Sequence, residues 1–409
     1  MSIKKQDMNY EKLYEYYLEQ EVLPNYGSFK SSSDLDSYEQ HRLNLFTGKL
    51  YLPKRLFQKA QLIEFGPSSG ENSLAFARWG ADCTLIEPNP KAHSSIRDYF
   101  KKFELSHKLV ALKDVDLKSF SESSAPSKKF DFIDAEGFIY TVRPESLWID
   151  LFARLVNDEG FVIIDYYETF GSFMELFLKV IYARVRQLTG LPAMEVTKNL
   201  FNEKWNSIPH GRPMEAWNMD VLENPFVRLR YFFEPQWLCK QMFEKDLHLY
   251  SSWPPYKDSL NQHWVKKTFK VDKHLHLQNE FISQSRLSHL FGRKHFLVNP
   301  DPVLEKDLKT LLKLNDSLID NFEADKAAQC IKYFSTIAEV INSNKTVSEP
   351  QDKSDTLDTI KSIQHIFRLL AAGDATDIIK FCNSDQSFIK SWGMPSHFAI
   401  FRKENLVRC

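Results

Sequence analysis

The feature that most constrains the fold is a repeated rhythm of short apolar segments and helix-like segments between residues 60 and 168. The apolar segments are QLIEF, CTLIE, KLVALKDVDL, FDFIDAEG and GFVIIDYYE, and they are separated by NSLAFARWG, NPKAHSSIRDYFKKF, SESSAPSK and PESLWIDLFARLV. Short apolar strands that alternate with helices of about 10–15 residues are typical of a parallel sheet covered on both faces. The sequence therefore predicts an α/β fold with a doubly wound sheet, in which a ligand binds beyond the carboxyl ends of the strands.

The rest of the chain divides into regions by its pattern. Residues 1–58 mix charged helix-like stretches with turn signals, so we expect an N-terminal helical lead-in. Residues 59–300 hold the sheet domain, in which LHLYSSW reads as a sixth strand and about 191–232 reads as an insertion beside the binding edge. Residues 301–409 are charged and helix-like, interrupted by NSNKTVSEPQDKSD, and predict a helical C-terminal region.

Charge and composition exclude several classes of protein. The chain has 53 Lys and Arg residues against 54 Asp and Glu residues, so no general basic field attracts nucleic acid. Its five cysteines form no CxxC pair, which favours reduced thiols in the cytoplasm over a disulfide framework. No apolar run reaches the roughly 18 residues of a membrane span, and the N-terminal segment is polar. We therefore expect a cytoplasmic globular protein without a nucleic-acid partner.

A glycine-containing loop follows the first predicted strand and reads Glu64-Phe-Gly66-Pro-Ser68-Ser-Gly70. Glycine is favoured where a ligand approaches the backbone, and a helix N-terminus offers free N–H groups. A dinucleotide fingerprint requires glycine where this chain has Ser68 and Glu71, and a carboxylate is unfavourable where a phosphate would bind. The chain also has no GxxxxGK(S/T) loop. The loop therefore argues against a dinucleotide or a nucleoside triphosphate.

Two acidic residues flank this loop in the sequence. Glu64 lies two residues before the turn, and Glu87 ends the second predicted strand, 17 residues after Gly70. A carboxylate beside the loop favours a ligand that carries an amine or a sulfonium, and a bidentate carboxylate at a strand end suits the two hydroxyls of a ribose. Together they describe a positively charged ribonucleoside without phosphate, and S-adenosylmethionine has that description.

The same stretches resemble the motifs of the class I S-adenosylmethionine-dependent methyltransferases. The loop is similar to motif I, (D/E)-x-G-x-G-x-G, with Ser68 in place of the middle glycine. LIEPNP is similar to the acidic motif II, DVDL to the region that contacts adenine, FDFIDAEG to motif IV, and NDEGFVIID to the motif of the fifth strand. The resemblance covers roughly residues 60–170 and implies a Rossmann-like fold with S-adenosylmethionine as methyl donor.

The resemblance also implies roles for individual residues. Those expected to bind the donor are Glu64, Gly66, Pro67, Ser68, Gly70, Glu87, Pro88, Asp114, Asp116, Asp134 and Ala135. The catalytic candidates are Asp134 and Glu136, which end the fourth strand, and His210, which lies in the insertion. Each acid also has a structural alternative, because acidic side chains commonly cap helices and turns.

The methyl acceptor is the least constrained part of the hypothesis. The HRLNLF lead-in and the helical tail resemble bacterial methyltransferases of surface polysaccharides or secondary metabolites, so we expect a sugar or another small metabolite. A protein methyltransferase is one alternative, and the C-terminal helices are expected to suit a protein partner. The other alternative is a donor-binding scaffold or regulatory module without transfer, whose acceptor face would be closed by Phe138 or Tyr140.

Two further patterns in the sequence do not indicate a functional site. SWPPY at 252–256 is similar to the (D/N)PPY motif of enzymes that methylate amines of nucleic acids, but Trp253 cannot accept a hydrogen bond from such an amine. HLH at 274–276, with His289 and His295 nearby, has no cysteines or acids at metal-ligand spacing. We therefore expect surface histidines and no metal site.

Overall fold

The computed structural model describes residues 13–20, 23, 27, 29–123, 129–209, 213–258, 271–293, 297–299, 301–343 and 350–404. The chain forms two compact units. Unit 1 consists of Met1–Tyr166, Pro235–Tyr256 and His397–Cys409, and unit 2 consists of Tyr167–Glu234 and Lys257–Ser396.

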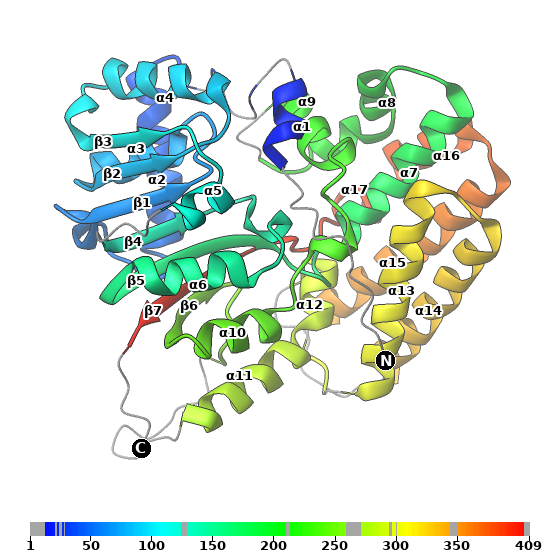
Figure 1. The fold of residues 1–409 in the computed structure, drawn as a ribbon. Helices are drawn as coiled ribbons and strands as arrows, with labels where there is room; N and C mark the ends of the chain where they lie inside the picture. Colours follow the sequence, from blue (N-terminus) through cyan, green and yellow to red (C-terminus); the bar gives the residue numbers. More distant parts are fainter. Residues whose placement is uncertain are drawn as a thin grey trace, which may run out of the picture. The chain divides into compact units, whose positions relative to one another are not determined.

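Unit 1 is built on a seven-stranded sheet with the order β3-β2-β1-β4-β5-β7-β6 (Figure 1). The strands are β1 (Gln61–Phe65), β2 (Asp82–Ile86), β3 (Leu109–Lys113), β4 (Phe130–Ala135), β5 (Val156–Tyr167), β6 (Leu247–Trp253) and β7 (Ser396–Lys403). The pairs among β1 to β5 are parallel, whereas β6 runs antiparallel to β7. Because the strand order reverses at β1, the carboxyl ends of β1 and β4 form the switch point where such sheets bind ligands.

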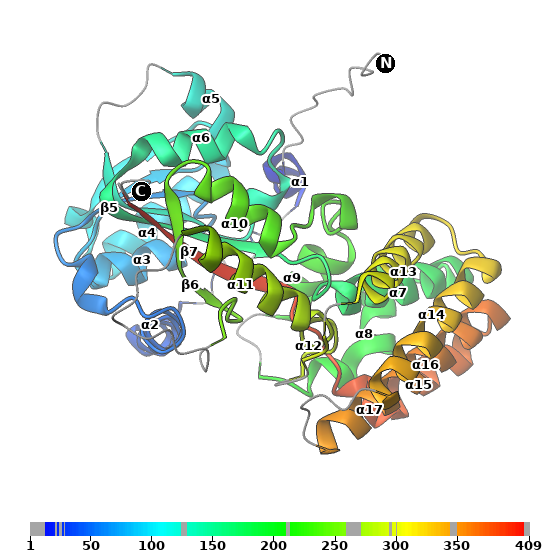
Figure 2. The ribbon, with the colours of Figure 1, turned by 90° about the horizontal axis from the view of Figure 1, so that it is seen from below.

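Helices cover both faces of this sheet (Figure 2). The α-helices of unit 1 are α1 (Leu13–Glu19), α2 (Ser32–Phe46), α3 (Glu71–Arg78), α4 (Pro90–Lys102), α5 (Leu117–Glu122), α6 (Ser146–Leu155) and α10 (Pro235–Phe243). Short 3-10 turns span Lys54–Phe57, Ser106–Lys108 and Ile139–Thr141.

Side chains of β1 alternate between the two helical layers. Leu62 packs in the apolar cluster that α2, α3 and α4 form on one face. Phe65 faces the other layer, where its ring lies 5.4 Å from those of Phe120 and Phe152 in α5 and α6. Glu64 therefore shares a face with Leu62 and points toward α3.

Helix α2 is held against α3 by polar contacts. Ser31 and Asp34 form a capping box that starts α2. The buried carboxylate of Glu39, one turn further along, accepts hydrogen bonds from Trp79 Nε1 at 2.9 Å and Lys54 Nζ at 2.7 Å. These contacts make α2 part of the layer that lies below the glycine loop.

The predicted Rossmann-like sheet is confirmed, and so is the sixth strand. The expected boundary at residue 300 differs from the structure, because residues 301–409 are not helical throughout. Strand β7 comes from the C-terminal end and lies between β5 and β6 in the sheet of unit 1. Strands pair by backbone hydrogen bonds, so the sequence of a strand does not show which other strands it pairs with.

Unit 2 is helical in the part that the structure describes. Its α-helices are α7 (Phe173–Thr189), α8 (Ala193–Trp205), α9 (Met214–Trp217), α11 (Val271–Gln284), α12 (Arg286–Phe291), α13 (Pro302–Asp320), α14 (Ala324–Ser343), α15 (Pro350–Ala372), α16 (Ala375–Ser384) and α17 (Gln386–Ile389). A π-helix spans Asn218–Leu222, and a 3-10 turn spans Leu229–Tyr231. The predicted insertion therefore forms helices of this unit.

His289, one of the histidines expected at the surface, is instead buried within α12. Its burial lowers the pKa of the imidazole to about 3, so the ring is neutral at physiological pH. His295 lies outside the described residues, as does the side chain of His274. Across the described helices of both units, none is at once long and apolar enough to cross a bilayer.

Candidate active site

The glycine loop links β1 to the N-terminus of α3 through three residues with left-handed backbone. These are Gly66 at φ +66°, Ser68 at φ +51° and Gly70 at φ +92°. Gly70 is the N-cap residue of α3, and its N–H donates to the Pro67 carbonyl at 2.9 Å. Left-handed backbone costs a residue with a side chain about 1–2 kcal/mol, so Ser68 occupies a position that suits glycine. The departure from motif I therefore keeps the turn but strains it.

Glu87 joins this loop to the end of β2. Its carboxylate accepts hydrogen bonds from the backbone N–H of Ser68 at 2.8 Å and of Asn89 at 2.8 Å. Burial raises the pKa of Glu87 to about 7, against the lowering effect of these two hydrogen bonds. Each carboxylate oxygen can accept more than one hydrogen bond, so both keep a lone pair for a ligand's hydroxyls. Glu87 therefore fixes the loop and retains capacity for the expected ribose.

A second acidic group lies where β1 and β4 end. Glu64 and Asp134 are register partners in the parallel pair, so their side chains extend from the same face of the sheet. The Ser73 hydroxyl of α3 donates a hydrogen bond to Glu64, whose pKa is raised to about 8 chiefly by burial. Asp134 is 0% exposed, and among the described side chains only the carboxyl of Glu136 lies within hydrogen-bonding reach of its carboxyl oxygens.

Burial raises the pKa of Asp134 well above its usual value, and the nearby carboxylates of Glu136 and Glu64 raise it further. Glu71, at the start of α3, is also buried, and its pKa is raised to about 7 although the Ser69 hydroxyl donates to it. Buried acids with raised pKa values cluster at functional sites more often than elsewhere. The region below the loop is therefore rich in carboxyl groups that burial keeps from ionising freely.

Glu136, just beyond β4, is paired with Arg42 of α2. The guanidinium forms a two-pronged ion pair with the carboxylate, at 2.8 Å from Nη1 and 2.6 Å from Nη2. Both side chains are nearly buried, at 8% and 9% exposure. Asn72 of α3 donates to the same carboxylate at 3.2 Å and accepts a hydrogen bond from Tyr38 of α2. Helix α2 thus supplies the cation of an otherwise acidic site.

Arg42, Tyr38 and Asn72 are missing from the residues that the sequence indicates for the site. The motif-based interpretation begins at the first strand, whereas α2 precedes it by some fifteen residues. A signal was nonetheless present, because Arg42 lies seven residues after Leu35 and four before Phe46, on the same apolar face of a capped helix, and a buried arginine requires an acidic partner. The sequence could not say which of the many acids that partner is.

The ring of Phe138 lies against the glycine loop. A Cβ built on Gly66 would approach Cδ1 of Phe138 to 2.8 Å and Cε1 to 2.9 Å. Tyr140, two residues further, is only 2% exposed. Gly66 is therefore needed both for its left-handed backbone and for the close approach of an aromatic ring. Phe138 occupies the side of the loop toward the end of β4.

The other expected site residues fall at the same edge of the sheet or outside the described part. Pro67 is buried in the loop, Pro88 follows Glu87, and Ala135 is buried in β4. Asp114 follows β3 and its charge raises the pKa of Glu87. Asp116 caps α5 by accepting a hydrogen bond from the Ser119 N–H at 2.7 Å, which matches its structural alternative. His210 lies outside the described residues.

Comparison with known families decides what kind of domain this is. A family model described as a methyltransferase domain matches residues 36–251, more than half of the chain. The chain belongs to this methyltransferase family. The matched range begins within α2 and ends within β6, so it includes the helix that supplies Arg42. The family resemblance inferred from the motifs is confirmed.

Solved structures with a similar arrangement include other methyltransferases. A proposed sarcosine dimethylglycine methyltransferase from Galdieria sulphuraria shares 10% identity, with 91% of this chain and 88% of that chain covered and a TM-score of 0.34. Magnesium protoporphyrin IX methyltransferase from Synechocystis PCC 6803 shares 14% identity, with 33% of this chain and 58% of that chain covered and a TM-score of 0.25. TehB from Haemophilus influenzae shares 15% identity, with 32% of this chain and 46% of that chain covered and a TM-score of 0.25. These TM-scores are too low to bear on the assignment. No curated protein matches the sequence.

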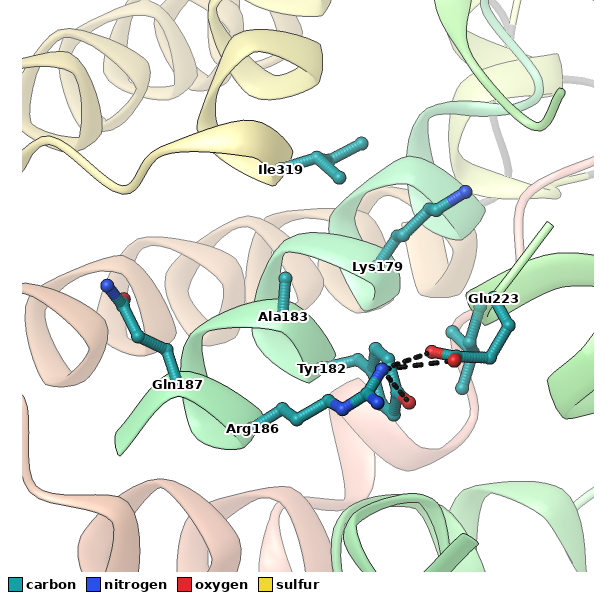
Figure 3. A pocket seen from close by; sticks show the side chains of 8 residues that line it. Lys179, Tyr182, Ala183, Arg186, Gln187, Glu223 and Ile319 are labelled. Carbon is teal, nitrogen blue, oxygen red and sulfur yellow. Dashed lines mark hydrogen bonds and ion pairs between the residues drawn. The ribbon is translucent and has the colours of Figure 1, made fainter. Parts of the chain in front are cut away.

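Unit 2 of this methyltransferase-family chain has a cavity of its own (Figure 3). Its volume is about 380 Å³, and it is lined by Lys179, Tyr182, Ala183, Arg186, Gln187, Leu222, Glu223 and Ile319. The guanidinium of Arg186 donates to both oxygens of Glu223 at 3.0 Å. Lys179 donates to the carbonyls of Asn224 and Val227, and its burial lowers its pKa to about 7. The charged side chains Lys179, Arg186 and Glu223 that line the cavity are thus engaged by neighbouring protein atoms.

Proposed function

We propose that this protein is an S-adenosylmethionine-dependent methyltransferase whose acceptor is a small molecule, such as a sugar or another small metabolite. The observation that carries the donor assignment is the gathering of acidic side chains around the loop. Glu64, Glu71, Glu87 and Asp134 are all buried around one left-handed loop, and Arg42 is the single buried cation among their described neighbours. Such a site opposes a phosphate and favours a sulfonium with an amine.

In this proposal the loop and the acids bind the donor. The backbone of the loop from Gly66 to Gly70 and the N-terminus of α3 lie against the methionine portion, and Glu87 binds the ribose hydroxyls. Methyl transfer is an in-line displacement at the sulfonium carbon. The protein accelerates it chiefly by holding the acceptor atom about 3 Å from the methyl group, in line with the departing sulfur.

A general base is required only if the acceptor must lose a proton. Glu136 has both oxygens engaged by Arg42, so its main role in this proposal is to hold α2 against the end of β4. Asp134 has a raised pKa and, among the described residues, no cation or N–H group engages its oxygens, which makes it the better suited of the two strand-end acids. His210 stays a candidate from the sequence.

The test is transfer of a labelled methyl group. The purified protein is incubated with S-adenosylmethionine labelled in the methyl group and a panel of free sugars, sugar nucleotides and phenolic or amine metabolites. We expect label in one small-molecule class and none in protein, with Glu87→Ala as the matched inactive control. Label that appears only in protein would support the protein methyltransferase instead.

The position of Phe138 favours a second candidate, a donor-binding module without transfer. Its ring lies against Gly66, and Phe138 follows the end of β4, where the family resemblance places the acceptor. In that case S-adenosylhomocysteine would bind, no acceptor would be labelled, and Phe138→Ala would not create activity. Activity that appears or rises in Phe138→Ala would instead identify the ring as a movable part of an active enzyme.

A further inference from the structure

The two carboxyl groups of Glu64 and Asp134 are buried side by side with few hydrogen-bond donors. The role of donor binding alone does not require such an arrangement. The two residues are register partners on adjacent strands, and both are almost completely buried. One oxygen of Glu64 is engaged by the Ser73 hydroxyl, whereas the only described side chain within hydrogen-bonding reach of the Asp134 carboxyl is the carboxyl of Glu136, which can share a hydrogen bond with it only while one of the two holds a proton. A buried carboxylate without a hydrogen-bond donor is costly, whereas a protonated carboxyl in the same place costs far less.

Groups from every neighbouring element determine the charge of this pair. Helix α2 contributes Arg42 and Tyr38, α3 contributes Glu71, β2 contributes the thiol of Cys83, and the end of β4 contributes Glu136. Arg42 is the only cation among them, and Glu136 already neutralises it through their two-pronged ion pair. The pair therefore has no unshared positive charge to offset two ionised carboxylates, and it retains a proton in the free protein.

We propose that the Glu64–Asp134 pair selects for a positively charged donor by releasing a proton to solvent when that donor binds. The proposal rests on the proposed function, because it concerns the same site. In the free protein one carboxyl of the pair holds a proton. When the cationic donor binds at the loop, that O–H bond breaks, the proton passes to solvent, and the new carboxylate offsets the donor's charge. No bond forms between the pair and the donor.

The protonation of this pair determines how the affinity for the donor changes with pH. Burial raises the pKa of Glu64 to about 8 and raises that of Asp134, so the pair is partly protonated at neutral pH. Raising the pH removes the proton before the donor arrives, and binding then requires no proton release. Affinity for the cation should therefore increase with pH, by up to about tenfold per pH unit where one full proton is exchanged.

A neutral nucleoside provides the contrast. 5′-Methylthioadenosine keeps the adenine, the ribose and the sulfur of the donor but carries no ionised group at neutral pH. Its binding should release no proton and should not strengthen as the pH rises. Selection for charge is thus distinguishable from recognition of the nucleoside.

The experiment is calorimetric titration of the full-length protein with S-adenosylmethionine at pH 7.0, in phosphate, MOPS and Tris, whose ionisation enthalpies differ. The slope of the observed enthalpy against the buffer's ionisation enthalpy gives the number of protons exchanged. We expect release of about one proton with S-adenosylmethionine, none with 5′-methylthioadenosine, and a loss of release in Asp134→Asn. Glu64→Gln provides a second variant in case the first does not fold.

Asp150→Asn is the matched control, because Asp150 is an exposed carboxylate of the same unit that pairs with Lys245. It should leave the proton release unchanged. If S-adenosylmethionine binds with no proton release in wild type, the inference is wrong while the proposed donor stands. If neither S-adenosylmethionine nor S-adenosylhomocysteine binds, the proposed function fails and this inference fails with it.

Discussion

The buried ion pair between Arg42 and Glu136 makes the sharpest prediction about stability. The two side chains are 8% and 9% exposed and share two hydrogen bonds of 2.8 Å and 2.6 Å. Arg42→Met keeps the apolar stem but leaves the carboxylate buried with only the Asn72 amide as donor, at 3.2 Å. Removing one partner of a buried pair typically costs about 3–5 kcal/mol. Because Asn72 remains, we expect a loss near the lower end, about 3 kcal/mol.

The assay is urea denaturation monitored by circular dichroism, with a double-mutant cycle. Glu136→Gln in the Arg42→Met background removes the stranded charge, so the double variant should recover most of the lost stability. The control is Arg402→Met, since Arg402 forms an exposed pair with Glu159 and should cost about 0–1 kcal/mol. The reasoning would be refuted if Arg42→Met cost no more than Arg402→Met, or if the double variant recovered nothing.

Two other predictions concern the loop and the buried acids. Ser68→Gly removes a side chain from a residue with left-handed backbone at φ +51°, so we expect the free energy of unfolding to stay unchanged or to rise by up to about 1 kcal/mol. Thermal unfolding measures this change. A loss of more than about 1 kcal/mol would contradict the strain argument. The free energy of unfolding should also fall between about pH 5 and pH 8. Glu64, Glu71 and Glu87 have folded pKa values raised to about 8, 7 and 7, so unfolded glutamates ionise first and the folded state loses its advantage as the pH rises. Denaturation midpoints that rise steadily across that range would contradict this sign.

Much of the fold could be predicted from the sequence because its signals are local. The strands from Gln61–Phe65 to Val156–Tyr167 are short apolar runs, and the turn after β1 is marked by glycines. The order of these elements leaves few topologies for a parallel sheet. Strand β7 could not be placed in the same way, because its partners are distant in sequence and it follows a long helical segment.

The candidate site was predictable to the same extent. Gly66, Gly70 and Glu87 belong to motifs, and the structure brings them to one edge of the sheet. Asp116 illustrates the limit of such reasoning, since an acid that follows a strand also suits the N-cap of the next helix. Arg42 illustrates another limit, because its partner Glu136 is 94 residues away and only the fold brings them together.

The central claim is that the loop and Glu87 bind S-adenosylmethionine. The most direct test is calorimetric titration with S-adenosylhomocysteine, with NAD as the control ligand, on wild type, Gly66→Val and Glu87→Ala. Gly66→Val would place a branched side chain against the Phe138 ring and force a left-handed valine. We predict that wild type binds S-adenosylhomocysteine and not NAD, and that both variants remain folded by circular dichroism but lose binding. Binding of NAD alone, or unchanged binding in both folded variants, would contradict the account.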